Sequence, residues 1–494
     1  MLKDSGSTWK ASDQDYLQVF HEQNPWHETG EVPDAWARKV ERPLANALWQ
    51  RLLHDDPHRF QIILGPRRVG KTTTMYQTVK RLHQSGISSD RLWWLRLDHP
   101  LLMQIRLDVL LKSIIKLAKA TTAQPVFLFL DELTYAKEWD LWLKTFYDES
   151  WPVRIAGSSS STAALRNRRI ESGVGRWEEQ YLAPYLFGEY LSLTGQQIEV
   201  PVRDSLSETI SACIESKISA RNLEGPRRKL LLTGGFPELL IRGSDAASDE
   251  TSLLLQSQRI LRSDAVERAV YKDIPQAFGR VENPMMLERV LYTLAGQVTG
   301  LLSPQNLCQG LDGLARQTFE RYFTYLERAF LVFSLANYSG NESSKQKRGR
   351  KIYFVDGAVR NAALQRGISP LNDPDEMGLL IENQAAGHLH TLSQQGQVRL
   401  YHWRDKNDEV DLIYDQPEYP LAFEIASSNS HSRGGLHQLV QRFPKFKENC
   451  YIVSPISPSI HPRNSPDQIG TVPLDVFLLA VSAQAERELS LSLC

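Results

Sequence analysis

The chain of 494 residues carries 57 lysines and arginines against 58 acidic residues, so its formal net charge is −1. A balance so near neutral gives no chain-wide attraction to nucleic acid, and such a partner would need a local basic patch. No apolar run approaches the roughly 18 residues of a membrane helix, and the N-terminus lacks the apolar core of a signal peptide. The four scattered cysteines exclude a disulfide scaffold and a cysteine-rich zinc site. We expect a soluble, cytoplasmic protein with no membrane partner and about three domains of roughly 150 residues.

Strands and helices alternate over the first 195 residues. The apolar spacing predicts helices over 43–53, 71–83 and 105–120, and strands at 60–64, 92–97, 126–130 and 153–155. This alternation is typical of a parallel α/β sheet. Helical periodicity then dominates to about residue 333, and strand signals return at 351–355, 398–402, 410–414, 421–425 and 450–453. We therefore expect domains at 1–195, 196–340 and 341–494.

The strongest motif is GPRRVGKT at 65–72, a G-x-x-x-x-G-K-T loop that follows a strand and opens a helix. Its glycines let backbone N–H groups and the helix N-terminus face anionic oxygens. Lys71 would reach the β- and γ-phosphates, and the Thr72 hydroxyl would ligate Mg²⁺. The predicted nucleotide-binding residues are Gly65, Pro66, Arg67, Arg68, Val69, Gly70, Lys71, Thr72 and Thr73.

A second acidic motif, VFLFLDE at 126–132, ends an apolar strand downstream of this loop. Asp131 would hold the Mg²⁺ water shell, and Glu132 would polarise the attacking water as general base. An apolar run followed by Asp-Glu is common, but paired with the loop it predicts a hydrolysis-competent NTPase that uses Mg²⁺.

These motifs resemble the AAA-superfamily ATPases of the archaeal-ATPase type, and the resemblance covers residues 42–191. Their pattern is a GPRRVGKTT loop, a Walker B motif followed by a tryptophan-bearing helix, a strand that ends in Gly-Ser-Ser-Ser, and G-R…L-x-P-x-S-F-x-E-Y. This chain has Trp139, AGSSS at 156–160, GR at 175–176 and LAPYLFGEY at 182–190, with Leu186 in place of the usual serine. The resemblance implies that Ser158 or Ser159 positions the lytic water. It also implies that Arg176 reads the γ-phosphate, in cis or from a neighbouring subunit of a homo-oligomer. The alternatives are a capping role for the serines and a surface position for Arg176 in the basic loop 166–176.

Residues 301–333 predict a helix-turn-helix, with a helix from 303, a turn at 311–314 and a long helix from 316. The resemblance adds that this region is a winged helix, with RQTF at 316–319 opening the recognition helix and the basic segment 345–351 near the wing. Such a module enters a DNA major groove in some proteins and serves only as a lid or a partner contact in others. The aromatic residues of the long helix share one face, which favours a core role.

Three carboxylates of the last domain resemble the E…D…E-x-K pattern of restriction-endonuclease-like PD-(D/E)XK domains: Glu382, Asp411 and Glu424. The resemblance implies that Asp411 and Glu424 bind Mg²⁺, with Glu382 as a further possible ligand. Ala426 stands where that family has its lysine, so a domain that binds without cutting is favoured. Arg433, Lys445 and Lys447 are candidate substitutes.

The expected fold is therefore α/β: a P-loop sheet of AAA type, a helical winged-helix domain, and an α/β restriction-endonuclease-like domain. The expected function is a Mg²⁺-dependent ATPase that drives or gates a nucleic-acid-binding C-terminal half, with DNA favoured over RNA. Two alternatives are an ATP-gated, metal-dependent nuclease and an ATP-dependent switch that engages protein partners only. Metal-dependent cleavage of nucleic acid would distinguish the nuclease from the non-cutting ATPase. Salt-sensitive DNA binding would distinguish both of these from the switch that engages protein partners only.

Overall fold

The computed structural model describes residues 13–38, 40–54, 58–160, 175–216, 218, 223–242, 249–278, 281–339, 349–417, 419–426, 432–455 and 458–491. These residues form two compact units. The first contains residues 13–64, 71–159 and 175–180, and the second contains residues 65–70, 160 and the described residues from 181 onward. Within the described ranges, no helix has the length and apolar character needed to cross a membrane. The division into domains at 195 and 340 stays a prediction.

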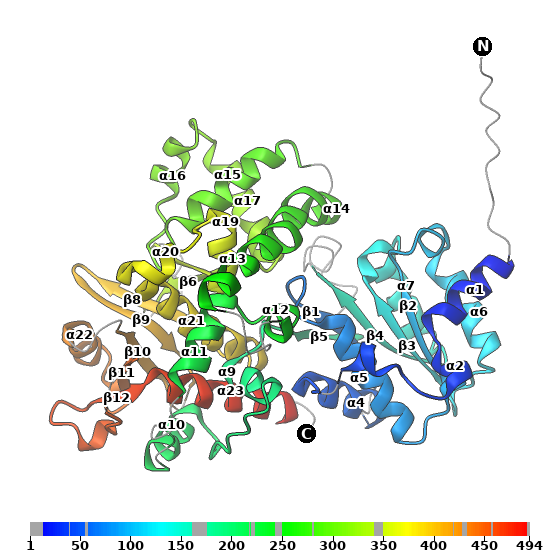
Figure 1. Ribbon diagram of the computed structural model, residues 1–494, viewed down its shortest axis with the longest axis horizontal. Helices are drawn as coiled ribbons and strands as arrows, with labels where there is room; N and C mark the ends of the chain where they lie inside the picture. Colours follow the sequence, from blue (N-terminus) through cyan, green and yellow to red (C-terminus); the bar gives the residue numbers. More distant parts are fainter. Residues whose placement is uncertain are drawn as a thin grey trace. The chain divides into compact units, whose positions relative to one another are not determined.

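The first unit is built on a five-stranded sheet in the order β2-β3-β4-β1-β5 (Figure 1). Neighbouring strands pair in parallel from β2 through β3 and β4 to β1. The fully buried β3 is a continuous apolar run ending in an acid, as expected for a strand covered on both faces. The strands are β1 (Phe60–Leu64), β2 (Leu92–Arg96), β3 (Val126–Asp131), β4 (Val153–Ser159) and β5 (Trp177–Tyr181). The predicted parallel α/β fold of this region is confirmed.

Helices cover both faces of this sheet. Right-handed crossovers place α5 on one face, beside α4, and α6 and α7 on the other (Figure 1). Their bounds are α4 (Pro43–His54), α5 (Lys71–Gln84), α6 (Leu107–Leu117) and α7 (Trp139–Asp148). The order of the strands brings the carboxyl ends of β1, β4 and β3 to adjacent places at one edge of the sheet.

Three short helices precede α4, and residues where the first two meet close the free side of β2. They are α1 (Asp13–Gln23), α2 (Trp26–Thr29) and α3 (Asp34–Ala37). The Asn24 side chain donates to the Trp94 carbonyl (3.0 Å) and accepts from the Trp94 N–H (2.6 Å), while the Trp26 indole donates to the Leu92 carbonyl (2.8 Å). These side chains satisfy backbone groups of an edge strand that would otherwise be open to pairing.

The helical part of the second unit contains the expected helix-turn-helix. α16 (Pro304–Gly310) and α17 (Arg316–Arg328) are joined by a turn at 311–315, and β6 (Val332–Asn337) then pairs antiparallel with β7 (Lys351–Phe354). The basic segment 341–351 falls largely outside the described residues. The remaining helices are α9 (Phe187–Leu193), α10 (Leu206–Glu215), α11 (Glu224–Thr233), α12 (Pro237–Arg242), α13 (Glu250–Leu261), α14 (Ile274–Phe278) and α15 (Pro284–Ala295), with π-helical turns at Arg262–Glu267 and Ala269–Asp273.

A mixed seven-stranded sheet, in the order β12-β11-β10-β9-β8-β6-β7, forms the rest of the second unit. α21 and α23 pack together on one apolar cluster of this sheet, and α22 packs against β9 in a second cluster. The elements are β8 (Leu400–Asp405), β9 (Asp408–Tyr414), β10 (Leu421–Ile425), β11 (Cys450–Ser454), β12 (Ile469–Pro473), α19 (Gly357–Leu364), α20 (Ser369–Asn372), α21 (Pro374–Gln395), α22 (Gly434–Arg442) and α23 (Leu474–Leu491). The predicted α/β character of the C-terminal region is confirmed.

Candidate nucleotide-binding site

The loop at 65–70 has the geometry of a phosphate cradle. It leaves β1 at Leu64, and α5 begins at Lys71. Arg68 and Gly70 adopt left-handed backbone angles, with φ of 67° and 95°, and alternation of handedness turns successive N–H groups toward one point. A side chain at Gly65 would place its Cβ 2.1 Å from the carbonyl oxygen of Leu182, so only glycine fits there. Glycine is therefore required at position 65 because a side chain would clash, and it is favoured at position 70 because the backbone there is left-handed.

Lys71 and the two threonines after it form the first turn of α5. The Lys71 side chain is buried, and Thr72 and Thr73 are half-buried. Pro66 and Val69 are buried in the loop, whereas Arg68 is exposed. Lys71 stands at a helix N-terminus, where cationic and N–H groups jointly favour bound anions.

A hydrogen-bonded group of three side chains lies at the carboxyl end of β3. The Thr72 hydroxyl donates to Asp131 Oδ2 at 2.8 Å, and the Ser158 hydroxyl donates to Asp131 Oδ1. Asp131 is buried, and burial raises the pKa of its carboxyl, while the two hydroxyl donors and the charge of Lys71 oppose that rise. Residues far apart in the sequence are thus joined through one carboxylate.

Glu132 is connected to the same group through its backbone. Its N–H donates to Ser158 Oγ at 3.1 Å, and its φ of 54° is left-handed. A non-glycine residue in this region is uncommon and is found where the chain must turn sharply. β4 continues through Ser159, and both serines are buried in this strand. Ser158 is the serine that reaches Asp131.

Arg176 immediately precedes β5 and is bound by a carboxylate of α7. Its Nε and Nη2 donate to the two oxygens of Asp148 at 2.7 and 3.0 Å. Hydrogen bonding from Arg176 lowers the pKa of Asp148, and the same bond raises the pKa of Arg176. Residues 161–174, which include most of the predicted basic loop, lie outside the described residues. The structure brings Thr72, Asp131, Glu132 and Ser158 together, and places Arg176 beside Asp148.

The two arginines of the loop are paired with carboxylates of the helical region, in the same unit. Arg67 donates to both oxygens of Asp273, and Arg68 contacts Glu238 and Asp264 at 2.7 Å each. Sequence spacing carries no signal for these pairs, since Arg67 and Asp273 are 206 residues apart.

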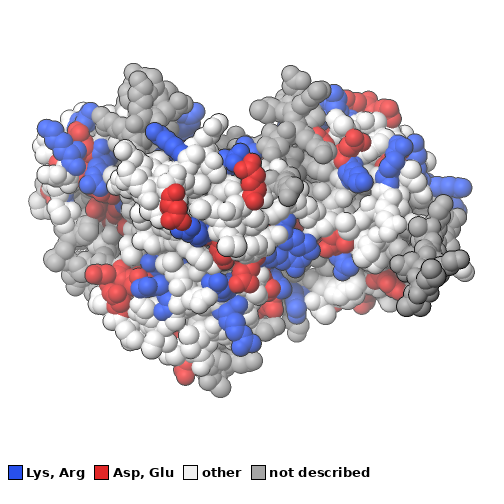
Figure 2. All heavy atoms as spheres, turned by 90° about the horizontal axis from the view of Figure 1, so that it is seen from above, with Lys and Arg blue, Asp and Glu red and all other residues white. Residues whose placement is uncertain are grey.

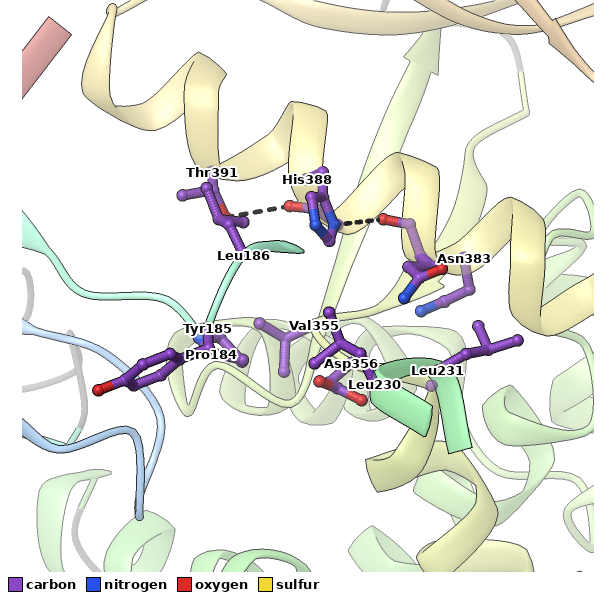
Figure 3. Close-up of a pocket in the computed structure, with 13 residues that line it drawn as sticks. Pro184, Tyr185, Leu186, Leu230, Leu231, Val355, Asp356, Asn383, His388 and Thr391 are labelled. Carbon is purple, nitrogen blue, oxygen red and sulfur yellow. Dashed lines mark hydrogen bonds between the residues drawn. The ribbon is translucent and has the colours of Figure 1, made fainter. Parts of the chain in front are cut away.

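The motif at 182–190 packs on the Gly-Gly-Phe-Pro segment at 234–237. The Tyr185 N–H donates to the Gly235 carbonyl at 2.6 Å, and the Gly235 N–H donates to Asp356 at 2.7 Å. A small cavity lies beside this contact, with a volume of about 30 Å³ (Figure 3). His388 in its wall accepts from the Phe187 N–H, and burial lowers its pKa to about 4. The cavity has room for about one water.

The predicted carboxylates of the C-terminal region are only partly brought together. Glu382 on α21 and Asp411 on β9 lie 2.9 and 2.7 Å from the Lys351 ammonium, and Glu409 lies 2.8 Å from it. Glu424 lies on β10, next to Ile425, whose N–H donates to Asp411 Oδ2 at 2.9 Å. Burial raises the pKa of Glu382 to about 8, with the charge of Asp411 adding to the rise and Lys351 opposing it.

Position 426 lies in an apolar environment. Ala426 is fully buried among apolar side chains of the cluster that includes Trp403 and Val410, and its N–H donates to the Val453 carbonyl. Two members of the carboxylate cluster around Asp411, namely Lys351 and Glu409, were not identified from the sequence. Lys351 was interpreted as the end of a basic segment, and only the close sequence spacing of Glu409 and Asp411 offered a hint.

Three segments of the chain match known protein families. Residues 57–191 match an AAA domain, and residues 226–370 and 377–464 match two domains of unknown function, DUF8612 and DUF4143. The AAA match contains the loop, Asp131, Glu132 and Ser158. Together with the parallel sheet, it supports a P-loop ATPase domain of the AAA class.

Uncharacterized proteins are similar to this chain over most of its length. One from Methanocaldococcus jannaschii is 26% identical over 377 residues, covering 74% of this chain and 75% of that protein. A second from the same organism is 23% identical over 359 residues, covering 72% of each. One from Haemophilus influenzae is 22% identical over 406 residues, covering 81% of this chain and 91% of that protein.

Solved structures are similar at a lower level. The Walker-type ATPase PABY2304 of Pyrococcus abyssi is 13% identical and gives a TM-score of 0.41, covering 66% of this chain and 97% of that one. The Aeropyrum pernix Orc1 protein in complex with DNA is 14% identical and gives a TM-score of 0.28, covering 71% of this chain and 98% of that one. The assignment of the first domain to the AAA class rests on the family match at 57–191 and on the geometry of the loop.

Proposed function

We propose that this protein is a Mg²⁺-dependent ATPase of AAA type whose ATP cycle gates a C-terminal half that binds DNA. The observation that carries the ATPase proposal is the group formed by Thr72, Asp131 and Ser158 at the end of the phosphate loop. It joins the first turn of α5 to two neighbouring strand ends through one buried carboxylate.

The residues fit a nucleotide-bound Mg²⁺. The Thr72 hydroxyl and the Asp131 carboxylate are hard oxygen donors that already lie 2.8 Å apart, and Mg²⁺ prefers such ligands. When bound, the ion would neutralise charge on the β- and γ-phosphates. Lys71 and the loop N–H groups would hold the phosphates.

Glu132 is the proposed general base. Its carboxylate would accept the proton of the attacking water, and Ser158 would fix its backbone through the 3.1 Å bond from the Glu132 N–H. Arg176 is the proposed γ-phosphate arginine. Asp148 engages the Nε–Nη2 edge of its guanidinium, so this edge would exchange Asp148 for phosphate.

The DNA-binding proposal is supported by α16 and α17 followed by the antiparallel strands β6 and β7, the order of elements in a winged helix. Arg316 and Arg321 are exposed on α17, as phosphate contacts require. On the face shown in Figure 2, basic and acidic side chains are interspersed, so binding would depend on a local set of arginines.

Salt-dependent DNA binding tests this second part. The slope of log affinity against log salt falls by about one for each phosphate contact removed. The double variant Arg316→Ala/Arg321→Ala should therefore reduce the slope by about two. The matched control is Arg259→Ala/Lys406→Ala, which removes two exposed basic residues elsewhere. Equal reductions of this slope in the two double variants, or no DNA binding by the wild type, would favour the switch that engages only protein partners.

Nuclease activity remains the chief competing proposal for the C-terminal domain. The buried, apolar surroundings of Ala426 support binding without cutting. DNA cleavage by the wild type with Mg²⁺ or Mn²⁺, absent in Asp411→Ala, would establish the ATP-gated nuclease instead.

A further inference from the structure

The C-terminal domain contains a buried ammonium surrounded by carboxylates. Lys351, the first residue of β7, has a side chain that is only 3% exposed. Its Nζ lies 2.7 Å from Asp411 Oδ1, 2.8 Å from Glu409 Oε1 and 2.9 Å from Glu382 Oε1. These are the separations of strong charge-assisted hydrogen bonds. An ammonium has three donors, and three carboxylates face it.

Further donors of the same chain contact these carboxylates. Asp411 Oδ2 accepts from the Ile425 N–H at 2.9 Å, and Glu409 Oε2 contacts Arg404 at 3.2 Å. The Tyr353 hydroxyl donates at 2.9 Å to Glu382 Oε1, the same oxygen that contacts the Lys351 ammonium. Backbone and side-chain donors from β7, β8 and β10 thus converge on carboxylates from α21 and β9.

This arrangement does not fit the divalent ion that the restriction-endonuclease resemblance implies. Among the described residues, no group of three or more His, Cys, Asp or Glu side chains is arranged to hold a metal ion. The resemblance assigns the ion to Asp411 and Glu424, with Glu382 as a further ligand, but Asp411 Oδ1 and Glu382 Oε1 are already bound by the Lys351 ammonium at 2.7 and 2.9 Å. An ion bound to those two oxygens would compete with the ammonium. Two cations in one buried place would repel strongly.

We propose that Lys351 replaces the divalent cation of this domain, so that the carboxylate cluster is complete without metal. This assignment rests on the geometry of the cluster and does not depend on whether the protein hydrolyses ATP. It also gives a reason, separate from Ala426, for the domain to bind DNA without cutting it. A lysine that holds three carboxylates has no free donor for a scissile phosphate and no exposure to reach one.

Metal titration of the full-length protein, without nucleotide, tests the proposal. Wild type, Lys351→Met, Asp411→Asn and Lys351→Met/Asp411→Asn are titrated with Mn²⁺ by calorimetry. Methionine keeps the length of the side chain and removes its charge. We expect Lys351→Met to gain one Mn²⁺ site relative to wild type, and the double variant to lose it. Thermal unfolding should agree with the titration. In the presence of chelator Lys351→Met should have a lower melting temperature than wild type, and Mn²⁺ should raise the melting temperature of this variant more than that of wild type.

The matched control is Lys445→Met, which neutralises a more exposed lysine paired with Asp415 in the same unit. It should gain no Mn²⁺ site. A folded Lys351→Met protein that gains no site would overturn the proposal. The wild-type titration decides independently of whether that variant folds: an Mn²⁺ site in wild type that disappears in Asp411→Asn would also overturn it.

Discussion

Replacing Ser158 by alanine should damage turnover far more than nucleotide binding. The Ser158 hydroxyl is fully buried, donates to Asp131 and accepts the N–H of Glu132. Alanine removes both contacts at once and leaves the carboxylate and the N–H short of a partner. Since Lys71 and the loop are untouched, the nucleotide dissociation constant should change little.

The size of the effect follows from these two bonds. A hydrogen bond to a charged group contributes about 1.5–3 kcal/mol. If that energy is lost only in the transition state, turnover falls roughly 10- to 150-fold. Steady-state ATP hydrolysis gives kcat, and fluorescence titration with a nucleotide analogue gives the dissociation constant.

The neighbouring Ser159→Ala is the matched control, because Ser159 is equally buried in β4. The sequence left the two serines as alternatives for the residue that positions water. Turnover in Ser159→Ala should stay close to wild type. A Ser158→Ala protein with undiminished kcat, or equal losses in both variants, would refute the role derived from the Asp131 contact.

Glu132→Gln should bind ATP normally and lose hydrolysis, because an amide cannot accept the proton of water; unchanged turnover would exclude Glu132 as the base. Arg176→Ala should lower kcat more than affinity, since its contact strengthens in the transition state; equal losses would indicate ground-state phosphate binding, and partial recovery on mixing with Lys71→Ala protein would indicate action from a neighbouring subunit. Hydrogen bonding from Arg360 holds the pKa of Glu376 below its ordinary value. The pair therefore stabilises the fold at pH values above the unfolded pKa of about 4.3. This stabilisation is lost as the pH falls through the lower pKa that Glu376 has in the folded protein. Glu376→Gln should therefore lower the melting temperature at pH 7 and leave it nearly unchanged at a pH below the folded pKa of Glu376. Equal destabilisation at these two pH values would contradict the linkage.

The nucleotide site could be predicted from the sequence because each of its parts is local. The loop, Lys71 and Thr72 are contiguous, and Asp131 directly ends an apolar strand. The parallel sheet then brings these strand ends together, as it does in any α/β fold. What the sequence could not give is which serine reaches Asp131, since alternate residues of a strand face opposite sides and the register was unknown.

The C-terminal cluster could be predicted only in part, for a different reason. Asp411 and Glu382 were identified by resemblance, but the cation between them comes from a strand 60 residues earlier than Asp411. Its partners are set by the pairing order of the mixed sheet, in which β7 is an edge strand. A lysine at the end of a basic segment gave no indication that it would be buried.

Phosphate release from ATP with Mg²⁺, measured for wild type and Lys71→Ala with and without DNA or RNA, tests the central claim most directly. Lys71 is the first residue of α5 and the proposed cationic ligand of the β- and γ-phosphates. The account predicts turnover in the wild type, abolished in Lys71→Ala and altered by DNA. A wild-type protein that releases no phosphate under any of these conditions, or a Lys71→Ala protein as active as wild type, would contradict it.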